Sequence, residues 1–502
     1  MHRADRHPFV TRHDASARNE LADAARAALE RGEERAVLDQ LATWLETDPA
    51  DELILHWYAL LCRALDEHEQ AGAALRRGGA ETTGNPGLAH LAARIALEAG
   101  LPAVGLFERA VALAPADSDA RLGLYSAMFA AGDGAQARSE LARVLAASPA
   151  WEAGHRQYAQ LSAMLGLGDE ALDTIERALK IHASAAVLHT TAIDLMIGAE
   201  RFADALELAD RASTALGDSP DLLFYRAIAL DEIGRSAEAG AIYSGLGPAR
   251  SPGHAIRVIR HLLRTGQPQG AAAELEPWLT RPGAENFWPL AALAWRLTGD
   301  ERADWLEAQP GMVSVIDLSP NDLGLDALCA FLRNRHAVSG RFLDQSVRGG
   351  SQTDGPLMAL IDPAIRRVRR CLVAAVESHV SRLPPPDPRH PLLAQRRDRT
   401  PRFAGSWSVR LDGAGFHASH HHPQGWISAA LYLAVPEGLQ GEAGQLALGE
   451  SPADLGLNLP PHAMVNPRPG RIALFPSYMW HGTRPFGAGE RMTIAFDIAR
   501  PC

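Results

Sequence analysis

The feature that most constrains this chain is an alanine that returns at a nearly constant interval between residues 36 and 303. The intervals run from 32 to 35 residues, and the alanines are Ala36, Ala71, Ala103, Ala137, Ala171, Ala205, Ala239, Ala271 and Ala303. A repeat of this length is a supersecondary unit that cannot bury its apolar face alone, so neighbouring copies must stack. The spacing therefore predicts an array of similar units with a continuous core.

Glycine and proline punctuate the same repeat. A glycine stands five residues before four of the alanines, at Gly132, Gly166, Gly234 and Gly266, and a proline follows twelve residues after two of them, at Pro115 and Pro149. Glycine commonly ends a helix and proline cannot continue one. The segments between these markers are amphipathic, as in DARLGLYSAMFAAGDGAQARSELARVLAASPA. We therefore expect pairs of antiparallel helices, with alanine at the close contact between them.

These helix pairs resemble the tetratricopeptide repeat, whose period is about 34 residues. The resemblance covers about residues 20–305 and implies an α-solenoid whose groove takes a peptide or a protein. We assign the solenoid to residues 20–308 and a flexible N-terminus to residues 1–19.

The sequence pattern changes near residue 310. Two helical stretches, residues 321–338 and 362–383, are followed by a proline-rich loop at residues 383–402. Short apolar or alternating runs then follow at residues 406–413, 426–435, 444–451, 470–477 and 491–499. Such runs, separated by turn residues, predict an antiparallel sandwich or barrel. We assign a second domain to residues 312–502, with a helical lead-in at 312–400 and a β core at 403–502.

Histidines gather on these predicted strands. His420 and His422 lie in FHASHHHPQGW, and residues at i and i+2 of an extended chain point to the same side, so both can bind one metal ion. His481 follows a later strand, and the sheet can bring it to the same place. Arg491 lies ten residues further on. His417 and His421 are expected to be bystanders, with His421 facing away from His420.

Five segments together resemble the iron(II)/2-oxoglutarate oxygenases, and more narrowly a bacterial and phage family of them that often follows tetratricopeptide repeats. The segments are DQSVRGGSQTDG, SWSVRLDGAGFHASHHHP, WISAALYLAVPEG, GRIALFPSYMWHGTRPF and ERMTIAFDIA. The resemblance implies a double-stranded β-helix (jelly roll) and the cofactors iron(II), 2-oxoglutarate and O2. The whole chain is then an α+β multidomain protein, with an N-terminal α-solenoid and a C-terminal jelly roll with flanking helices.

Residue by residue, the resemblance implies that His420 and His481 bind iron and that Arg491 pairs with the distal carboxylate of 2-oxoglutarate. Thr493 would donate a hydroxyl to that carboxylate. Tyr432 resembles the tyrosine that reaches the same carboxylate in prolyl hydroxylases. A purely structural role for Tyr432, as a packing residue between strands, is an equally open interpretation.

His422 departs from the pattern of most enzymes of this superfamily, which hold iron with two histidines and one carboxylate. Either His422 is the third ligand, or His420 and His481 bind alone with water in the third position. The leading hypothesis is a 2-oxoglutarate-dependent dioxygenase that hydroxylates a peptide or protein recruited by the solenoid. Two alternatives are a repeat scaffold with an inactive oxygenase domain, and a tris-histidine metal dioxygenase acting on a small molecule.

Composition restricts the partners and the compartment. A net charge of −11 argues against nucleic acid, and no apolar run is long enough to cross a bilayer. The first twenty residues lack the apolar segment of a signal peptide. The four cysteines are too scattered for a disulfide framework. We therefore expect a cytoplasmic protein with no membrane contact.

Overall fold

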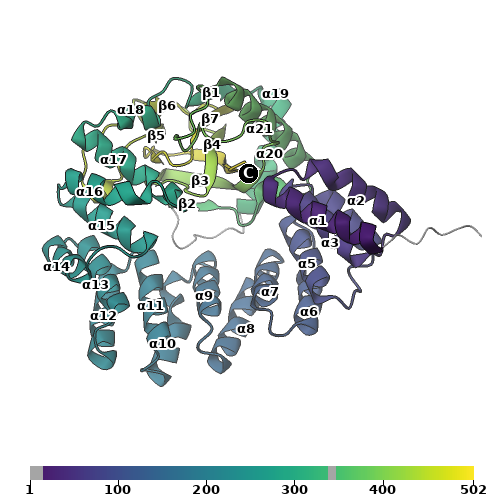
Figure 1. Ribbon diagram of the computed structural model, residues 1–502, viewed down its shortest axis with the longest axis horizontal. Helices are drawn as coiled ribbons and strands as arrows, with labels where there is room; N and C mark the ends of the chain where they lie inside the picture. The colour runs from purple at the N-terminus through teal and green to yellow at the C-terminus, as the bar shows by residue number, and fades with distance from the viewer. Residues whose placement is uncertain (1–14, 337–345, 502) are drawn as a thin grey trace, which may run out of the picture. The chain divides into compact units, whose positions relative to one another are not determined.

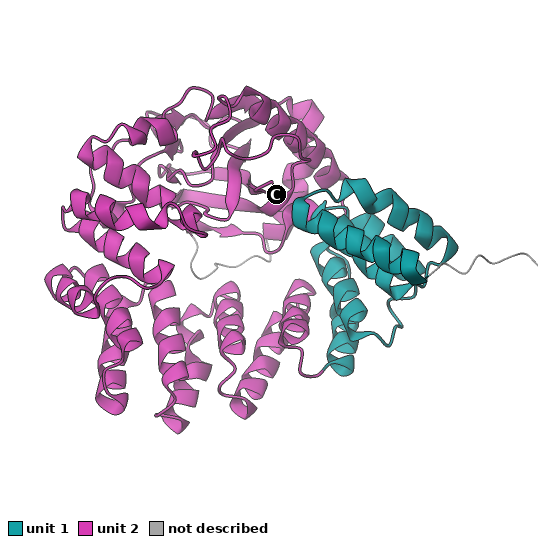
Figure 2. Ribbon diagram, viewed as in Figure 1, with its two compact units in different colours: residues 1–114, 502 teal, residues 115–501 magenta. Residues whose placement is uncertain are grey.

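The structure is a computed structural model that describes residues 15–336 and 346–501. The chain divides into two compact units, residues 1–114 and residues 115–501 (Figure 2). Of the N-terminal segment expected to be flexible, residues 1–14 lie outside the described residues, and the first helix begins at Ala15. None of the described helices is both long and apolar enough to span a lipid bilayer.

The first unit consists of helices packed on their sequence neighbours (Figure 1). They are α1 (Ala15–Arg31), α2 (Arg35–Thr47), α3 (Glu52–Ala64), α4 (His68–Arg77), α5 (Pro86–Glu98) and α6 (Val104–Leu113). Two of the helices start at capping side chains, since Asp51 accepts hydrogen bonds from the backbone at the start of α3 and Asn85 does so at the start of α5. Each cap satisfies backbone N–H groups that have no partner within the helix.

The second unit continues the helix pairs and then adds the sheets. Its repeat helices are α7 (Ser118–Ala130), α8 (Gly134–Ala147), α9 (Glu152–Met164), α10 (Asp173–Ile181), α11 (Ala186–Gly198), α12 (Phe202–Leu216), α13 (Pro220–Glu232), α14 (Ser236–Leu246), α15 (Pro252–Arg264), α16 (Pro268–Leu275), α17 (Trp288–Thr298) and α18 (Arg302–Glu307). These helices pack mainly on their neighbours in sequence, as stacked repeats do.

The recurrent alanines mark the start of the second helix of each pair. From Ala71 to Ala303 every one of them is buried, as expected for small residues at the contact between two helices. The preceding glycines, Gly132, Gly166, Gly234 and Gly266, have φ between 72° and 94°, a conformation that ends the first helix and that glycine adopts without strain. Ala36 is exposed, so at the first marker the expected role is wrong.

The C-terminal part contains flanking helices and strands. The helices are α19 (Pro320–Leu323), α20 (Leu325–His336) and α21 (Pro363–Arg382). The strands are β1 (Ser314–Asp317), β2 (Val347–Gln352), β3 (Phe403–His417), β4 (Gly425–Ala434), β5 (Leu446–Leu448), β6 (Ala463–Val465), β7 (Arg471–Pro476), β8 (His481–Thr483) and β9 (Glu490–Ala499).

The strands form two antiparallel sheets. The larger sheet has the order β1-β7-β4-β9-β3-β2 and the smaller one β6-β5-β8. In the larger sheet β9 lies between β3 and β4, with Thr493 opposite Val409 on one side and Tyr432 on the other. The fold class expected from the sequence, a helical-repeat region followed by an antiparallel jelly-roll domain, is confirmed.

The hydrophobic core of the second unit runs without a break from the last helix pairs into the sheet. One cluster of buried side chains contains Leu290, Trp295 and Leu306 together with Trp480 and Phe496. Two hydrogen bonds reinforce it, because the Tyr478 hydroxyl donates to the carbonyl of Leu306 at 2.7 Å and the Trp480 indole donates to that of Pro289 at 2.8 Å. Because the helices and the sheet share this core, the core does not mark a domain boundary near residue 310. That boundary remains a prediction from the change in sequence pattern.

This shared core predicts where the chain can be cut. A fragment of residues 310–502 loses the partners of Trp480 and Tyr478, and we expect it to aggregate or to unfold without cooperativity. A fragment of residues 248–502 keeps α15–α18 and should unfold cooperatively. Circular dichroism melting and size-exclusion chromatography compare the two. Equal melting temperatures for two monodisperse fragments would contradict the structural role given to α15–α18.

Candidate active site

A pair of backbone hydrogen bonds brings the distant histidines together. The amide of His420 donates to the carbonyl of His481 at 2.9 Å, and the amide of His481 donates back to that of His420 at 2.8 Å. Gly482 makes this close approach possible, since a Cβ there would lie only 3.0 Å from the carbonyl oxygen of His417. The bridge sets the ring centres of His420 and His481 4.2 Å apart.

His422 completes a group of three. Its amide donates to the carbonyl of Ser477 at 2.9 Å, and its ring centre lies 5.0 Å from the ring centres of both His420 and His481. One ring nitrogen from each of the three histidines lies within 4.8 Å of the other two. The structure thus gathers the three histidines that the sequence analysis singled out.

Hydrogen bonds fix the protonation of these rings. The Nδ1 atoms of His420 and His481 lie 2.8 Å and 3.0 Å from the carbonyl oxygens of Ala418 and Met479, and Nδ1 of His422 lies 2.7 Å from Oδ1 of Asp497. Each oxygen is an acceptor, so each Nδ1 carries a proton, and in the neutral ring Nε2 is then the nitrogen with the lone pair. Burial and the neighbouring rings hold the pKa of His420 and His481 well below its usual range, which favours the neutral form.

The donor set fits a divalent transition metal. Three neutral imidazoles with Nδ1–H held by protein acceptors are the arrangement in which histidines bind such ions. A metal ion about 2.1 Å from each nitrogen requires these atoms, which lie within 4.8 Å of one another, to approach more closely. His420, His422 and His481 can therefore hold one ion once their rings turn toward it.

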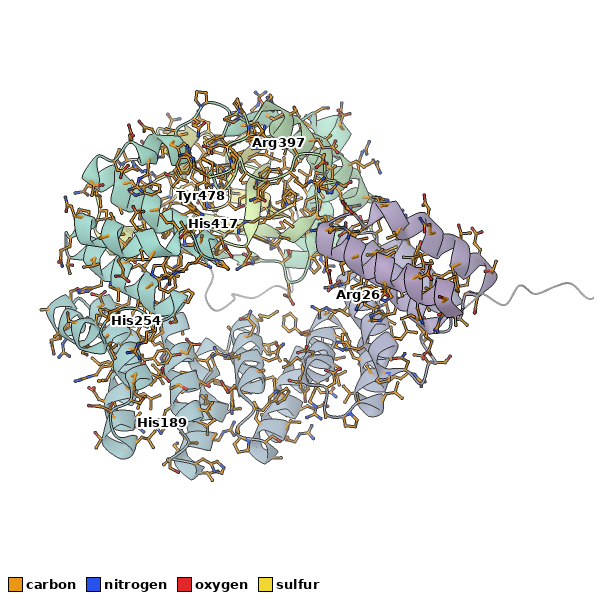
Figure 3. All side chains as sticks on the ribbon, in the orientation of Figure 1. Arg26, His189, His254, Arg397, His417 and Tyr478 are labelled. Atoms are coloured by element: carbon orange, nitrogen blue, oxygen red, sulfur yellow. The ribbon has the colours of Figure 1, made fainter. Side chains whose placement is uncertain are left out.

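The two other histidines of the cluster lie beside this group. The ring of His421 packs edge-on against Trp480 with the centres 4.6 Å apart and does not belong to the group of three, although it borders the same cavity. His417 stands at the end of β3 (Figure 3) and stacks near His420 with ring centres 5.9 Å apart. Burial, reinforced by Arg491, lowers the pKa of His417 to about 3.

The histidines open into a cavity of about 410 Å³. Trp407, Leu446 and Phe475 form apolar parts of its wall, and Gln352 and Thr493 contribute polar groups. Apart from its histidines, Arg491 is the one ionisable side chain among the described residues that line it. A cavity with a cationic wall and no carboxylate selects for an anionic ligand.

Arg491 is 3% exposed and has no carboxylate within ion-pair distance among the described residues. The Nε atom of Arg491 is buried and has no hydrogen-bond partner among the described residues. The guanidinium carbon of Arg491 lies 5.1 Å from the centre of the Tyr432 ring. A buried cation without a counter-ion is costly. An anion bound in the cavity would supply the missing charge.

Thr493 and Tyr432 lie next to Arg491. Thr493 lines the cavity and is paired with Tyr432 across β9 and β4. Tyr432 is fully buried and is not among the lining residues, but its hydroxyl has no partner within the described chain. Both are thus close to the cation, and the two interpretations of Tyr432 stay open.

The sequence analysis missed Asp497, Ser428 and Gln352. Asp497 lies an even number of residues after both Arg491 and Thr493 on β9, which places all three on one face of the sheet. That alternation was visible in RMTIAFDIA and was the signal that could have found Asp497. Gln352 comes from β2, a strand whose sequence VRGGSQ gives little sign of being one.

Two stretches of the chain match models of known protein families. Residues 405–497 match the model of the family described as "Putative 2OG-Fe(II) oxygenase", and residues 103–161 match that of the tetratricopeptide repeat. The two resemblances found in the sequence are therefore confirmed. A search of curated proteins gave no match.

Solved structures of both kinds are similar to the chain. A prolyl-4-hydroxylase from Pseudomonas putida is 22% identical, with a TM-score of 0.26, over 38% of this chain and 92% of its own. HygX from Streptomyces hygroscopicus, solved with nickel and 2-oxoglutarate bound, is 14% identical with a TM-score of 0.26, over 38% and 83%. Yeast Tom70 is 13% identical with a TM-score of 0.34, over 60% and 68%.

The buried, unpaired cation predicts a gain in stability when it is removed. Arg491→Met should raise the free energy of unfolding of the ligand-free protein by about 1–3 kcal/mol, because it replaces an uncompensated charge with an apolar side chain. Arg484→Met is the control, since Arg484 is paired with Glu450 at 2.6 Å and its loss should not stabilise. Urea denaturation measures both. A destabilised Arg491→Met protein would show that the arginine is already compensated.

Proposed function

We propose that this chain is a non-haem iron(II), 2-oxoglutarate-dependent dioxygenase that hydroxylates a peptide or protein recruited by its helical repeats. The observation that carries the proposal is Arg491, a buried cation that lines the cavity shared by the three histidines and has no counter-ion in the described part of the chain. A metal site alone fits many enzymes. A metal site beside an uncompensated guanidinium suits a ligand that chelates at one end and carries a carboxylate at the other.

In this proposal His420, His422 and His481 hold iron(II) through their Nε2 atoms. The bound iron, with 2-oxoglutarate and O2, supplies the oxidising power that converts a C–H bond of the substrate to C–OH. Arg491 binds the distal carboxylate of 2-oxoglutarate, where its planar fork can donate to both oxygens. Thr493, and Tyr432 if its hydroxyl turns toward that carboxylate, add neutral donors.

The remaining wall of the cavity orients the substrate and excludes water. Trp407 and Phe475 are large apolar groups beside the histidines, at ring-centre distances of 5.5 Å from His422 and 4.7 Å from His481. Such walls strengthen the electrostatic attraction between Arg491 and an anion, because they lower the local dielectric constant.

A peptide or protein substrate is supported by the repeats. A solenoid offers an extended surface suited to protein segments, and a partner held there has a high effective concentration at a site on the same chain. A free metabolite small enough for the cavity would need no such surface.

A tris-histidine dioxygenase that acts on a small molecule without 2-oxoglutarate is the second candidate. The absence of a carboxylate among the three grouped ligands favours it. Arg491 disfavours it, because a reaction without 2-oxoglutarate gives this buried cation no evident task. A scaffold with an inactive domain would have no use for either feature.

Substitution of the histidines tests the metal site. His420→Ala and His481→Ala should each abolish stoichiometric iron(II) binding, because each removes one of three nitrogens. His421→Ala is the matched control from the same segment and should bind iron like the parent, since that ring packs on Trp480. Isothermal titration calorimetry with iron(II) under anaerobic conditions measures the stoichiometry of iron binding. Full binding by the His481→Ala protein would end the assignment.

Succinate release from 2-oxoglutarate tests the cosubstrate and the substrate class. Arg491→Ala should raise the KM for 2-oxoglutarate roughly 30-fold or more, since losing one partner of a buried charge pair costs about 2–5 kcal/mol. Iron binding should be unchanged. A peptide pool from a host lysate should stimulate release by the parent. Turnover that does not depend on 2-oxoglutarate would favour the tris-histidine candidate.

A further inference from the structure

The three candidate ligands differ in the group that accepts the hydrogen bond from their Nδ1–H. The Nδ1–H groups of His420 and His481 donate to backbone carbonyls, which are uncharged. The Nδ1–H of His422 donates to a carboxylate, Asp497, at 2.7 Å. His422 is also the ligand that occupies the position where most enzymes of the class have a carboxylate.

Asp497 has no other charged partner among the described residues. It is 8% exposed, and its one ion-pair contact is with His422. The Ser428 hydroxyl donates to the same Oδ1 at 2.5 Å, which holds the carboxylate in place without neutralising it. A buried carboxylate in this setting is stabilised by a positive charge nearby, and a cation bound by the three histidines would supply one through His422.

The surrounding backbone leaves room for this arrangement. At Gly425 a Cβ would lie 2.4 Å from the Ser477 hydroxyl and 3.2 Å from Cβ of Asp497. Any side chain there would push Ser477 and Asp497 aside. The Ser428 hydroxyl lies 2.9 Å from that of Ser477, and the Ser477 carbonyl accepts the amide of His422. Ligand and carboxylate are therefore held by one connected set of contacts.

We propose that Asp497 is a positioning residue that acts on the metal through His422. It takes the place of the carboxylate that binds the metal directly in most enzymes of the class, with the imidazole of His422 between it and the ion. It keeps the proton on Nδ1, aims the Nε2 lone pair at the ion, and supplies the negative charge that three neutral histidines lack. Histidine–carboxylate pairs raise the basicity of the ligand nitrogen. The inference rests on the proposed function, because it requires a divalent metal at these histidines.

Cobalt(II) binding to the full chain tests the proposal, with visible absorption as the readout. Asp497→Asn preserves the shape and the acceptor oxygen but removes the charge, and we expect cobalt(II) affinity to fall about 10–100-fold. Asp412→Asn, an exposed carboxylate on β3, is the matched control and should bind like the parent. Circular dichroism melting of the metal-free Asp497→Asn protein should show a folded chain.

The effect should shrink when the imidazole between Asp497 and the metal is removed. In the His422→Asp background Asp497 has no Nδ1–H to accept and no ligand ring to orient, so Asp497→Asn should change cobalt(II) affinity much less than it does in the parent. A purely structural role predicts the same loss in both backgrounds, and that result would overturn the proposal.

The reduction potential of bound iron gives a measurement that does not need the His422→Asp protein. Removing the negative charge should raise the potential in Asp497→Asn, and an unchanged potential with unchanged cobalt(II) affinity would overturn the role of Asp497. A parent protein that binds no cobalt(II) or iron(II) would instead refute the proposed function, and the inference with it. The two failures are thus distinguishable.

Discussion

The candidate site depends on one backbone contact, the bridge between His420 and His481. The two residues are far apart in sequence, and their imidazoles meet because each amide donates to the other's carbonyl. The same segment extends the smaller sheet, since His481 is also paired with Leu448 of β5. The two candidate ligands are therefore placed by main-chain pairing, which constrains them more tightly than side-chain packing alone would.

The turn that leads into His481 is anchored to the last repeat helices. Tyr478 and Trp480, which stand just before the histidine, donate their side-chain hydrogens to carbonyls of Leu306 and Pro289. The Tyr478 and Trp480 side chains are almost fully buried in the core that the helices share with the sheet. In this unit the end of the solenoid is thus a structural wall of the oxygenase domain, in addition to any role in recruiting a partner.

Sequence reasoning predicted most of what depends on periodicity. The alanine interval located the helix contacts from Ala71 onward, and the alternating runs located β3, β4, β7 and β9 within a few residues. It missed β6 and β8, which have three residues each, and also β1 and β2. β1 has only four residues, and β2 contains two adjacent glycines, so neither shows an alternation that stands out from a loop.

For the site, the sequence predicted the residues whose chemistry is unusual and missed those whose chemistry is ordinary. Three histidines and one arginine stand out from their surroundings, and the structure brings all of them to one cavity. Asp497 and Ser428 are common residue types, and their importance comes from a contact across strands between residues 69 positions apart. A contact of that kind depends on register, which the sequence of one strand does not specify.

Strand β9 shows how the fold tolerates a polar, charged cavity. Met492, Ile494, Phe496 and Ile498 belong to the buried core on one face, while Arg491, Thr493 and Asp497 project from the other. A shift of one residue in register would exchange the two sets, placing charges in the core and apolar groups in the cavity. The apolar face therefore does more than stabilise the domain: because that face fixes the register between β3 and β4, the core that offsets the cost of burying Arg491 and Asp497 also holds both residues at the histidines.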